Sequence, residues 1–397
     1  MYLKSLNLCN YRCFEKFHID FDEDLTVIVG SNGAGKTSAL EAAAVALGTI
    51  FTSMDGLTGR NITSSDAYRK SFLVGSSEDM QMQYPVEVEA DAVIDRSSVH
   101  WKRSLTNSEG KTTVVDAKEI RAVGAELQTK LRDGDKKVRL PMIAYYATNR
   151  LWDYHREKKS DVFRTNTRTN GYIDCLSGTT NLKLMLNWFR KITVQKYQRQ
   201  ERGLEPIPEH LAVYKAMECC FTEMADCSDV YVYYNIDSNE LNVEYTEKNG
   251  LRKSEPFSIL SDGYKSTISL VADIAYRMAI LNPQLLDTIL SETRGVIMID
   301  EIDLHLHPRW QQKVLTVLRK IFPKIQFIVT THAPAVINSV KTKNLRILKD
   351  YELVPAGSEV YGKEAGAVLS EIMGASSRPV YVEEKLNLFK QFLNAGK

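Results

Sequence analysis

The strongest indication of the fold lies in the stretch of residues 25–48, which reads LTVIVGSNGAGKTSALEAAAVALG. Its first five residues are mostly apolar, as in a strand that is buried on both faces. Residues 30–37 satisfy the pattern GxxxxGK[ST], and the alanine- and leucine-rich run that follows favours a helix. The alternative is a glycine-rich turn that binds no ligand, but such a turn does not require a strand before it and a helix after it. The order therefore predicts a phosphate-binding loop.

The loop predicts how a nucleoside triphosphate would be held. Glycines let consecutive backbone N–H groups point at phosphate oxygens, at the positive end of the new helix. The expected nucleotide-binding residues are Gly30, Ser31, Asn32, Gly33, Ala34, Gly35, Lys36, Thr37 and Ser38. Lys36 would neutralise the β- and γ-phosphates, and the Thr37 hydroxyl would bind Mg²⁺. ATP and Mg²⁺ are therefore the expected substrate and cofactor.

A second motif, GVIMIDEIDLHLHPRW at residues 295–310, begins as another buried strand. Asp300 and Glu301 follow this strand directly, at the edge where open α/β sheets bind their ligands. We expect Asp300 to hold the Mg²⁺. Glu301 would polarise the attacking water and accept its proton. A chance pair of charges at a strand end is the alternative, and the phosphate-binding loop makes that alternative weak.

A third motif, QFIVTTHAPAVINSV at residues 326–340, is a strand that ends at His332. A lone histidine at a strand end is usually structural or solvated. Beside a phosphate-binding loop and an Asp-Glu strand, His332 is better placed to donate a hydrogen bond to the γ-phosphate or to water.

A fourth motif, SILSDGYKS at residues 258–266, opens a helix whose apolar residues recur at helical spacing. Ser261 and Asp262 supply the chemistry of a helix start, and Gly263 permits close approach of another backbone. On spacing alone, a plain helix N-cap is the favoured interpretation.

The four motifs together resemble a known family. LSDGYKS is similar to the LSGGQ-type signature of ABC ATPases, and the order of motifs resembles the RecF, SMC and OLD branch of that superfamily. The blocks AYYATNRLW, LSDGYKSTISLVADIAYRM, IDEIDLHLHPRWQ and FPKIQFIVTTHAPAVI resemble the PtuA-type ATPase subunits of Septu anti-phage systems most closely.

This resemblance implies an α/β fold: a P-loop ABC-ATPase head with a mixed sheet, flanking helices, an antiparallel β layer and a short inserted helical lobe. It implies that two heads enclose two nucleotides. Ser261, Asp262 and Gly263 of one head would close the site of the other, and Asp303 matches the loop that crosses the dimer seam. Arg12 matches a basic position near the nucleotide, with an ordinary surface arginine as the equal alternative.

Two features depart from simple expectations. ABC heads usually carry a glutamine after the strand that here spans residues 140–146, and the sequence has none there. Thr148 or Asn149 would have to replace it. His305 and His307 form an HxH pair, but no cysteine or second histidine pair accompanies them, so zinc is not expected.

The two ends of the chain are expected to build one ATPase head. Its predicted parts are residues 1–150 and 251–350, with a helical and β insertion lobe at 151–250 and a C-terminal helical tail at 351–397. The lobe is too short for the long coiled coils of SMC proteins. The tail is too short for a Toprim nuclease domain, and the sequence shows no HNH-type cluster.

Basic residues gather in two parts of the lobe. They are Arg156, Lys158, Lys159, Arg164 and Arg168, then Lys183, Arg190, Lys191, Lys196, Arg199 and Arg202 on a predicted helix over residues 181–202. A solvated helix face explains such charges equally well. The alternative is contact with the phosphate backbone of DNA or tRNA.

Composition limits the remaining classes. The chain has 51 basic and 50 acidic residues, so it is not a strongly cationic nucleic-acid protein. Its six cysteines form no CxxC pair, and no apolar run reaches the roughly 18 residues of a membrane helix. We therefore expect a cytoplasmic protein without a membrane contact.

The function that the resemblance implies is an ATPase that acts as a homo-oligomer, at least a dimer. It would regulate a separate effector in anti-phage defence, and an HNH-type nuclease is the effector that we favour. The alternatives are a nucleotide-gated scaffold with negligible turnover and a RecF-like repair ATPase that acts directly on DNA.

Overall fold

The computed structural model describes residues 1–150, 167–179, 182–374 and 380–394. Its centre is a six-stranded sheet in the order β15-β14-β3-β13-β12-β8. All neighbouring strands run parallel except β14 and β15, which pair antiparallel. The strands are β3 (Leu25–Val29), β8 (Met142–Tyr146), β12 (Gly295–Ile299), β13 (Ile325–Thr331), β14 (Leu345–Lys349) and β15 (Glu352–Val354). The predicted mixed sheet is confirmed.

The second sheet is antiparallel and has the order β2-β1-β6-β7. Its strands are β1 (Tyr2–Tyr11), β2 (Phe14–Asp20), β6 (Val86–Ile94) and β7 (Ser97–Leu105). In β6 every second residue is buried, because this sheet turns one face to the core and the other to solvent. The alternation of Val86, Val88 and Ala90 and the run from Val99 to Leu105 predict a β layer over residues 84–115, and β6 and β7 confirm it.

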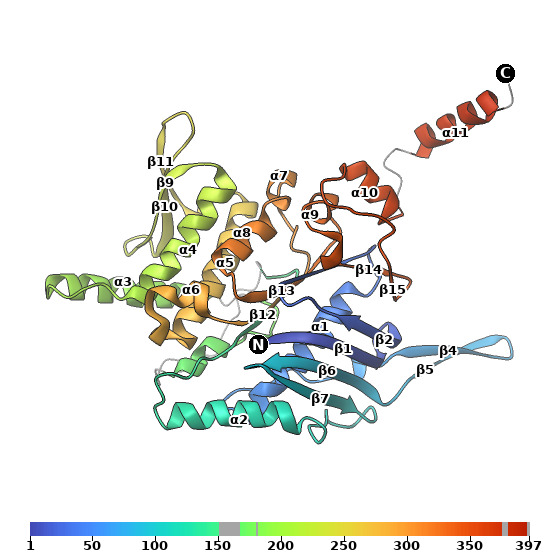
Figure 1. Ribbon diagram of the computed structural model, residues 1–397, viewed down its shortest axis with the longest axis horizontal. Helices are drawn as coiled ribbons and strands as arrows, with labels where there is room; N and C mark the ends of the chain where they lie inside the picture. The colour runs from blue at the N-terminus through green and yellow to red at the C-terminus, as the bar shows by residue number, and fades with distance from the viewer. Residues whose placement is uncertain (151–166, 180–181, 375–379, 395–397) are drawn as a thin grey trace.

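Helix α1 (Lys36–Leu47) lies between these two sheets (Figure 1). A helix in that position has no face for polar residues, and nine of its twelve residues are buried. Its small alanines let both sheets approach closely. The indole Nε1 of Trp101, on β7, donates to the Ala46 carbonyl at 3.0 Å. The sheets are also joined directly by Gln326 of β13, whose side chain accepts from the Leu3 N–H and donates to the Leu3 carbonyl.

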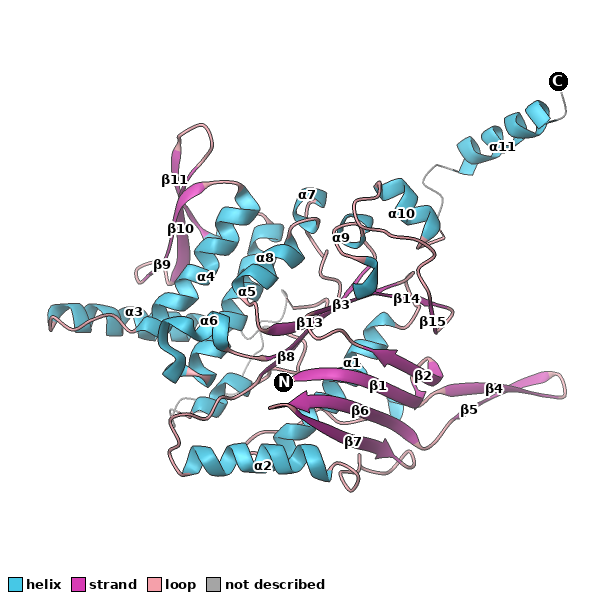
Figure 2. Cartoon of the chain, viewed as in Figure 1, coloured by secondary structure: helices cyan, strands magenta, loops and turns pink. Residues whose placement is uncertain are grey.

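The inserted lobe packs beside this head (Figure 2). It contains α3 (Leu182–Glu201), α4 (Pro208–Ala225) and a three-stranded sheet in the order β11-β10-β9. The strands of this sheet are β9 (Ser228–Asn235), β10 (Glu240–Thr246) and β11 (Arg252–Pro256). Helix α4 packs along α5 (Asp262–Leu281), the helix that the fourth motif opens. The sequence predicts helices over residues 181–202 and 210–224 and strands over residues 230–236 and 241–245. The structure confirms them as α3, α4, β9 and β10, and β11 was not predicted.

The described residues form seven further α-helices. They are α2 (Lys118–Arg132), α6 (Ile289–Glu292), α7 (Pro308–Gln311), α8 (Val314–Ile321), α9 (Pro334–Ile337), α10 (Ala365–Glu371) and α11 (Val380–Asn394). The sequence predicts helices over residues 118–133, 365–373 and 382–394, and the structure has α2, α10 and α11 there. No helix in the described ranges is both long and apolar enough to cross a membrane.

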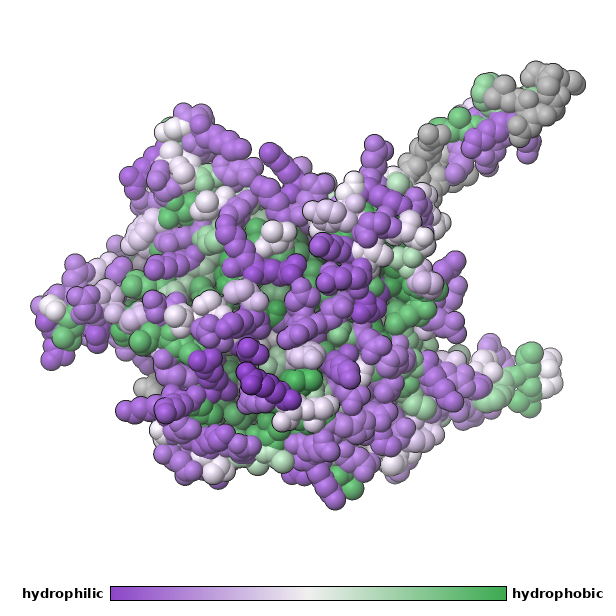
Figure 3. Space-filling view, viewed as in Figure 1, coloured by the Kyte–Doolittle hydropathy of each residue, from purple (hydrophilic) through white to green (hydrophobic). Residues whose placement is uncertain are grey.

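One hairpin was not predicted. Strands β4 (Arg69–Val74) and β5 (Ser77–Met82) pair with each other alone and project from the head. Figure 3 shows green, apolar atoms at the tip of this hairpin, where Leu73 and Val74 are 85% and 63% exposed. The sequence lacks the alternation of a half-buried strand here, because neither face of the hairpin packs on a core.

The expected basic stretch falls mostly outside the described residues. Arg156, Lys158, Lys159 and Arg164 lie in the range 151–166. Arg168 is described, and its guanidinium donates to the backbone carbonyls of Leu281 and Val138, both at 2.7 Å. The side chain of Arg168 therefore holds the lobe against α5, a structural use that its charge did not predict.

Gly295 offers a test of how closely the central strands pack. A Cβ at this position would lie 1.8 Å from the Met142 carbonyl oxygen of β8. We expect Gly295→Ala to destabilise the protein by about 3 kcal/mol, because the sheet cannot make room without moving backbone. Gly357→Ala is the control, since its Cβ would meet nothing within 4 Å. Urea unfolding measures both, and equal midpoints would contradict the packing.

Candidate nucleotide site

The phosphate-binding loop has the backbone that its glycines predict. Gly33 and Gly35 have φ angles of +82° and +101°, a region that side chains disfavour, and α1 begins directly afterwards at Lys36. The Lys36 side chain curls over the loop, and Nζ donates to the carbonyls of Gly30 and Ser31 at 2.9 Å each. Burial lowers the pKa of Lys36 below its usual value, and the carboxylates of Glu301 and Asp300 oppose that shift.

Asp300 is the point where the separate motifs meet. Its Oδ2 accepts a hydrogen bond of 2.8 Å from the Thr37 hydroxyl at the start of α1. Its Oδ1 accepts one of 2.5 Å from the Thr330 hydroxyl on β13. Its backbone N–H donates to the Tyr146 carbonyl at the end of β8. Asp300 is 2% exposed, so one buried carboxylate joins three strands and the loop.

Glu301 takes an unusual backbone conformation, with φ at +45°. Its N–H donates to the Thr330 hydroxyl at 2.8 Å, so the same hydroxyl fixes both members of the Asp-Glu pair. The Glu301 side chain is half-buried, and among the described residues its carboxylate has no hydrogen-bond partner. A carboxylate held in this way can accept a proton from a bound water.

Arg150 is a site residue that the sequence did not predict. It is 3% exposed, and its guanidinium donates to the carbonyls of Asp300 at 2.8 Å and Glu301 at 3.1 Å. Burial lowers the pKa of Arg150 to about 10, which still leaves it charged at neutral pH. Thr148 and Asn149, the expected substitutes for the missing glutamine, are exposed. Arg150 holds the backbone behind the carboxylates.

His332 and Asp303 lie next to each other in the same chain. His332 Nδ1 is 3.7 Å from Asp303 Oδ2, and the imidazole is 44% exposed. Asp303 is 5% exposed, and its other carboxylate oxygen accepts from the Thr331 hydroxyl. The described geometry therefore gives Asp303 a contact within its own head, and its expected place at a dimer seam stays a prediction.

Arg12 lies beside α1 in a cluster of charges. Its turn has a φ of +53°, and its guanidinium pairs with Asp66 at 2.8 Å and with Glu41 of α1. Arg60 also pairs with Glu41, at 2.9 Å, and lies 5.4 Å from the ring centre of Tyr145. These partners are spread over the first half of the chain, so no short sequence pattern indicates the cluster. Arg12 is anchored rather than free on the surface.

The signature segment is exposed at its serine and packed at its glycine. Ser261 and Asp262 are exposed, and the Ser261 side chain makes no capping hydrogen bond. A Cβ on Gly263 would lie 2.7 Å from the Trp310 ring and 2.9 Å from the His305 carbonyl. Tyr264 packs on Trp310 with ring centres 4.2 Å apart. The LHPRW block therefore supports the start of α5.

The structure brings together some predicted site residues and leaves others apart. Lys36, Thr37, Asp300 and Glu301 form one group, with His332 on the neighbouring strand end. In the described ranges, no hydrogen bond or ion pair links Ser261 or Asp262 to the loop at 30–38. His307 caps α7 by accepting from the Arg309 N–H at 3.3 Å. The described residues hold no cluster of three or more His, Cys, Asp or Glu side chains suited to a metal.

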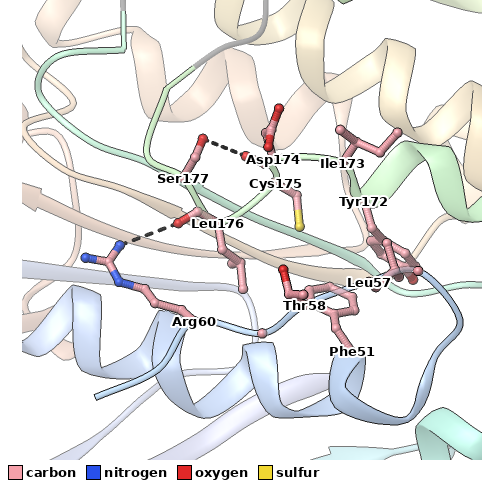
Figure 4. A pocket seen from close by; sticks show the side chains of 12 residues that line it. Phe51, Leu57, Thr58, Arg60, Tyr172, Ile173, Asp174, Cys175, Leu176 and Ser177 are labelled. Carbon is pink, nitrogen blue, oxygen red and sulfur yellow. Dashed lines mark hydrogen bonds between the residues drawn. The ribbon is translucent and has the colours of Figure 1, made fainter. Parts of the chain in front are cut away.

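A separate cavity of about 480 Å³ lies beyond the far end of α1 (Figure 4). The segments 51–60 and 172–177 line it, and Arg60 donates to the Leu176 carbonyl at 3.5 Å across its edge. Burial raises the pKa of the Cys175 thiol to about 12, so this thiol stays protonated and unreactive. The cavity is no part of the phosphate-binding loop.

Comparison with known proteins assigns the chain to a family. Residues 5–211 match a family model described as an AAA domain. The chain belongs to this AAA domain family. The AAA domain protein is 24% identical over 434 residues to a retron Vc95 probable ATPase from Vibrio cholerae serotype O1 biovar El Tor, covering 98% of this chain and 82% of the relative. It is 24% identical over 403 residues to a Septu protein PtuA from Bacillus thuringiensis, covering 96% and 87%.

A solved structure supports the fold. The crystal structure of an Smc head bound to the C-terminal winged-helix domain of ScpA matches with a TM-score of 0.50 and 16% identity, over 89% of this chain and 98% of that one. The prediction of an ABC-type ATPase head in the RecF and SMC branch, similar to PtuA, is confirmed. The AAA domain protein is an ATPase and a nucleotide-binding protein.

The two hydrogen bonds of Thr330 predict a defect that is specific to the site. Thr330→Val keeps the side-chain shape but leaves the Glu301 N–H without its acceptor, which we expect to cost about 1–3 kcal/mol of stability. The rate of ATP hydrolysis should also fall at least tenfold, because the Asp-Glu pair loses its support.

Thr26→Val is the matched control for this variant. Thr26 is also fully buried, and its hydroxyl accepts from the Asp22 N–H at the opposite end of β3. It should lose similar stability and keep its ATPase rate. Equal rates in the two variants at saturating ATP would refute the role given to Thr330.

Proposed function

We propose that the chain hydrolyses ATP with Mg²⁺ at the site built around Asp300. The observation that carries this proposal is the 2.8 Å contact between the Thr37 hydroxyl and the Asp300 carboxylate. It joins a phosphate-binding loop to an acidic strand end 263 residues away in the sequence. Phosphoryl transfer in P-loop proteins requires both components, a loop that holds the phosphates and an acidic residue that holds the Mg²⁺.

The oxygens at this contact fit a magnesium ion. A hydroxyl and a carboxylate are hard donors, which Mg²⁺ prefers, and in P-loop proteins the same two groups hold it. Thr37 and Asp300 would be its protein ligands. When bound, the ion would supply positive charge beside the β- and γ-phosphates of ATP.

The other residues of the site divide the work of hydrolysis. The loop residues 30–38 would cradle the phosphates with backbone N–H groups, and Lys36 would neutralise them. Glu301 would orient the attacking water and take its proton, because its carboxylate is half-buried and otherwise unengaged. His332 would donate to the γ-phosphate. Arg150 would be a positioning residue that keeps Glu301 in place.

We further propose that the site is completed by a second copy of the chain. Ser261, Asp262 and Gly263 of the partner would close over the nucleotide, with Asp303 near the seam and Arg12 close to the nucleotide. The exposure of Ser261 and Asp262 supports this proposal, because a capping serine would normally bond to its own helix. The resemblance to two-headed ATPases supports it as well.

A regulatory role is the next part of the proposal. Because the similar proteins include a retron probable ATPase and a Septu protein PtuA, we propose that ATP turnover controls a separate effector in anti-phage defence. An HNH-type nuclease is the effector we favour. Contact with DNA or tRNA is part of this proposal, since exposed basic residues such as Arg190 and Lys196 lie on α3.

We propose a division of the chain that follows these roles. The proposed parts are residues 1–150 and 251–350 for the ATPase head, residues 151–250 for the insertion lobe and residues 351–397 for the helical tail. Strands β11 and β15 lie just past two of these boundaries, since β11 pairs with β10 of the lobe and β15 with β14 of the head. Strand β3 near the start of the chain pairs with β13 and β14 near its end, which supports a head built from both parts.

Glu301→Gln tests the assignment of the base. We expect this variant to bind ATP with nearly normal affinity and to lose at least about 99% of its turnover, because an amide cannot accept the proton. Fluorescent-nucleotide titration and phosphate release measure the two properties. Glu384→Gln, on the exposed face of α11, is the control. Normal hydrolysis by the Glu301 variant would show that Glu301 is not the general base.

Mixing two inactive variants tests the shared site. Lys36→Ala removes the loop lysine, and Ser261→Arg blocks the signature, so each homodimer should be inactive. After free exchange at equal concentrations, about half of the dimers are mixed, each with one intact composite site. About a quarter of the wild-type rate should therefore return.

The control for this mixing experiment is Ser108→Arg, which changes an exposed serine in a loop of the head. That variant should be active alone. If the mixture of Lys36→Ala and Ser261→Arg stays inactive while size-exclusion chromatography shows exchanged dimers, the shared site is wrong.

A further inference from the structure

The insertion lobe carries a groove of about 500 Å³ between α3, α4 and the edge strand β9. We name it the tyrosine groove, because its lining includes Tyr197, Tyr214, Tyr231, Tyr233 and Tyr234. Tyr197 and Tyr231 are 55% and 48% exposed, so solvent reaches their rings although they lie in a cluster of tyrosines. The nucleotide site uses none of these residues.

The rings of the tyrosine groove are held in place. Tyr231 and Tyr233 stack on each other, with centres 5.8 Å apart and planes inclined by 21°. The Tyr214 hydroxyl lies 3.3 Å from the Thr193 hydroxyl, and its ring packs on Phe189. Burial raises the pKa of Tyr214 to about 12, so this phenol is neutral at physiological pH. The groove therefore offers fixed, uncharged aromatic faces.

Two lysines and two acids line the groove. Glu244 is paired with Arg252 at 2.8 Å, and Glu218 accepts from the Val232 N–H at 3.1 Å. Burial raises the pKa of Glu218, and the charges of Lys215 and Lys196 oppose that shift, so both lysines face this acid. In the part of the chain that the structure describes, neither lysine takes part in an ion pair, so both ammonium groups can contact a phosphate.

We propose that the tyrosine groove binds single-stranded nucleic acid. Exposed aromatic rings on which bases stack, next to cations that contact the phosphates, are the two elements of such sites. A duplex keeps its bases stacked inside and cannot offer their faces to Tyr197 and Tyr231. The groove would therefore prefer a single strand to a duplex, and it would not distinguish one base sequence from another.

A protein strand added to the free edge of β9 is the competing occupant. Such a strand needs the outward N–H and carbonyl groups of β9. The Val232 N–H already donates to Glu218 within the lobe. The edge is therefore partly blocked, whereas the ring faces and lysines are open.

This proposal rests on the nucleic-acid contact proposed above and gives it a place and a strand preference. The first test uses the full chain with fluorescein-labelled oligo(dT) and oligo(rU) of 20 nucleotides, and a 20-base-pair duplex. Fluorescence anisotropy should show tighter binding of the single strands than of the duplex. The double variant Tyr197→Ala/Tyr231→Ala should weaken single-strand binding at least about tenfold.

Matched variants separate stacking from a loss of folding. Tyr197→Phe/Tyr231→Phe keeps the rings and should keep the affinity within about twofold. Tyr361→Ala/Tyr381→Ala removes two rings that are as exposed, at 60% and 68%, but lie outside the groove. This control should also bind normally. The ATPase rate of every variant reports whether the head is intact.

The lysines predict a change in salt dependence. Lys196→Ala/Lys215→Ala should lower the slope of log Kd against log salt by about 1.4, since each phosphate contact to a single strand contributes about 0.7. The tyrosine variants should leave that slope unchanged while they weaken binding at every salt concentration.

Three results would overturn the proposal, and they differ in what else they reject. If the wild-type chain binds none of the three probes, both the groove and the wider nucleic-acid contact fail. If the Tyr197→Ala/Tyr231→Ala variant keeps normal affinity, the groove fails and the contact lies elsewhere. If that variant binds oligonucleotides normally but loses a co-expressed effector on gel filtration, the groove is a protein interface. None of these results bears on ATP hydrolysis.

Discussion

The structure depends most on the buried carboxylate of Asp300. Its two oxygens accept hydrogen bonds from Thr37 and Thr330, which places the end of β12 between the phosphate-binding loop and β13. Its own backbone joins β8 through Tyr146. A buried charge is costly unless it is paired or fully hydrogen-bonded, so each of these partners stabilises the fold as well as the site. The position of Glu301 follows from this arrangement, since the same Thr330 hydroxyl receives its N–H.

Much of the head could be predicted because its signals are local. The apolar run before Gly30 and the acidic pair after Ile299 each carry strand and site in a few consecutive residues. Arg150 could not be predicted in this way. Arg150 contacts the backbone carbonyls of Asp300 and Glu301, which lie about 150 residues away in the sequence. Because every residue has a backbone carbonyl, no sequence pattern indicates these contacts. The same holds for Thr330, because nothing in the sequence of β13 distinguishes its hydroxyl from that of Thr331 until β12 and β13 pair.

The signature segment shows why a motif can have two causes. A glycine at position 263 is required by the chain itself, because Trp310 and the His305 carbonyl leave no space for a side chain. The spacing of helix-start residues indicated close approach but not the partner. The aromatic contacts continue into the lobe, since Tyr264 stacks on Phe221 of α4 with ring centres 5.2 Å apart. Helix α4 also carries Tyr214 of the tyrosine groove, so one rigid helix spans the distance between lobe and head.

The order of strands in the central sheet also determines when this sheet can form. Strand β3 pairs with β13 and β14, which are synthesised about 300 residues after it. At synthesis rates of about 5–20 residues per second, β3 waits roughly 15–60 seconds for these pairing partners. During that time the apolar run from Leu25 to Val29 lacks both of its neighbouring strands. A nascent chain of this design needs protection from aggregation until β13 and β14 have been synthesised.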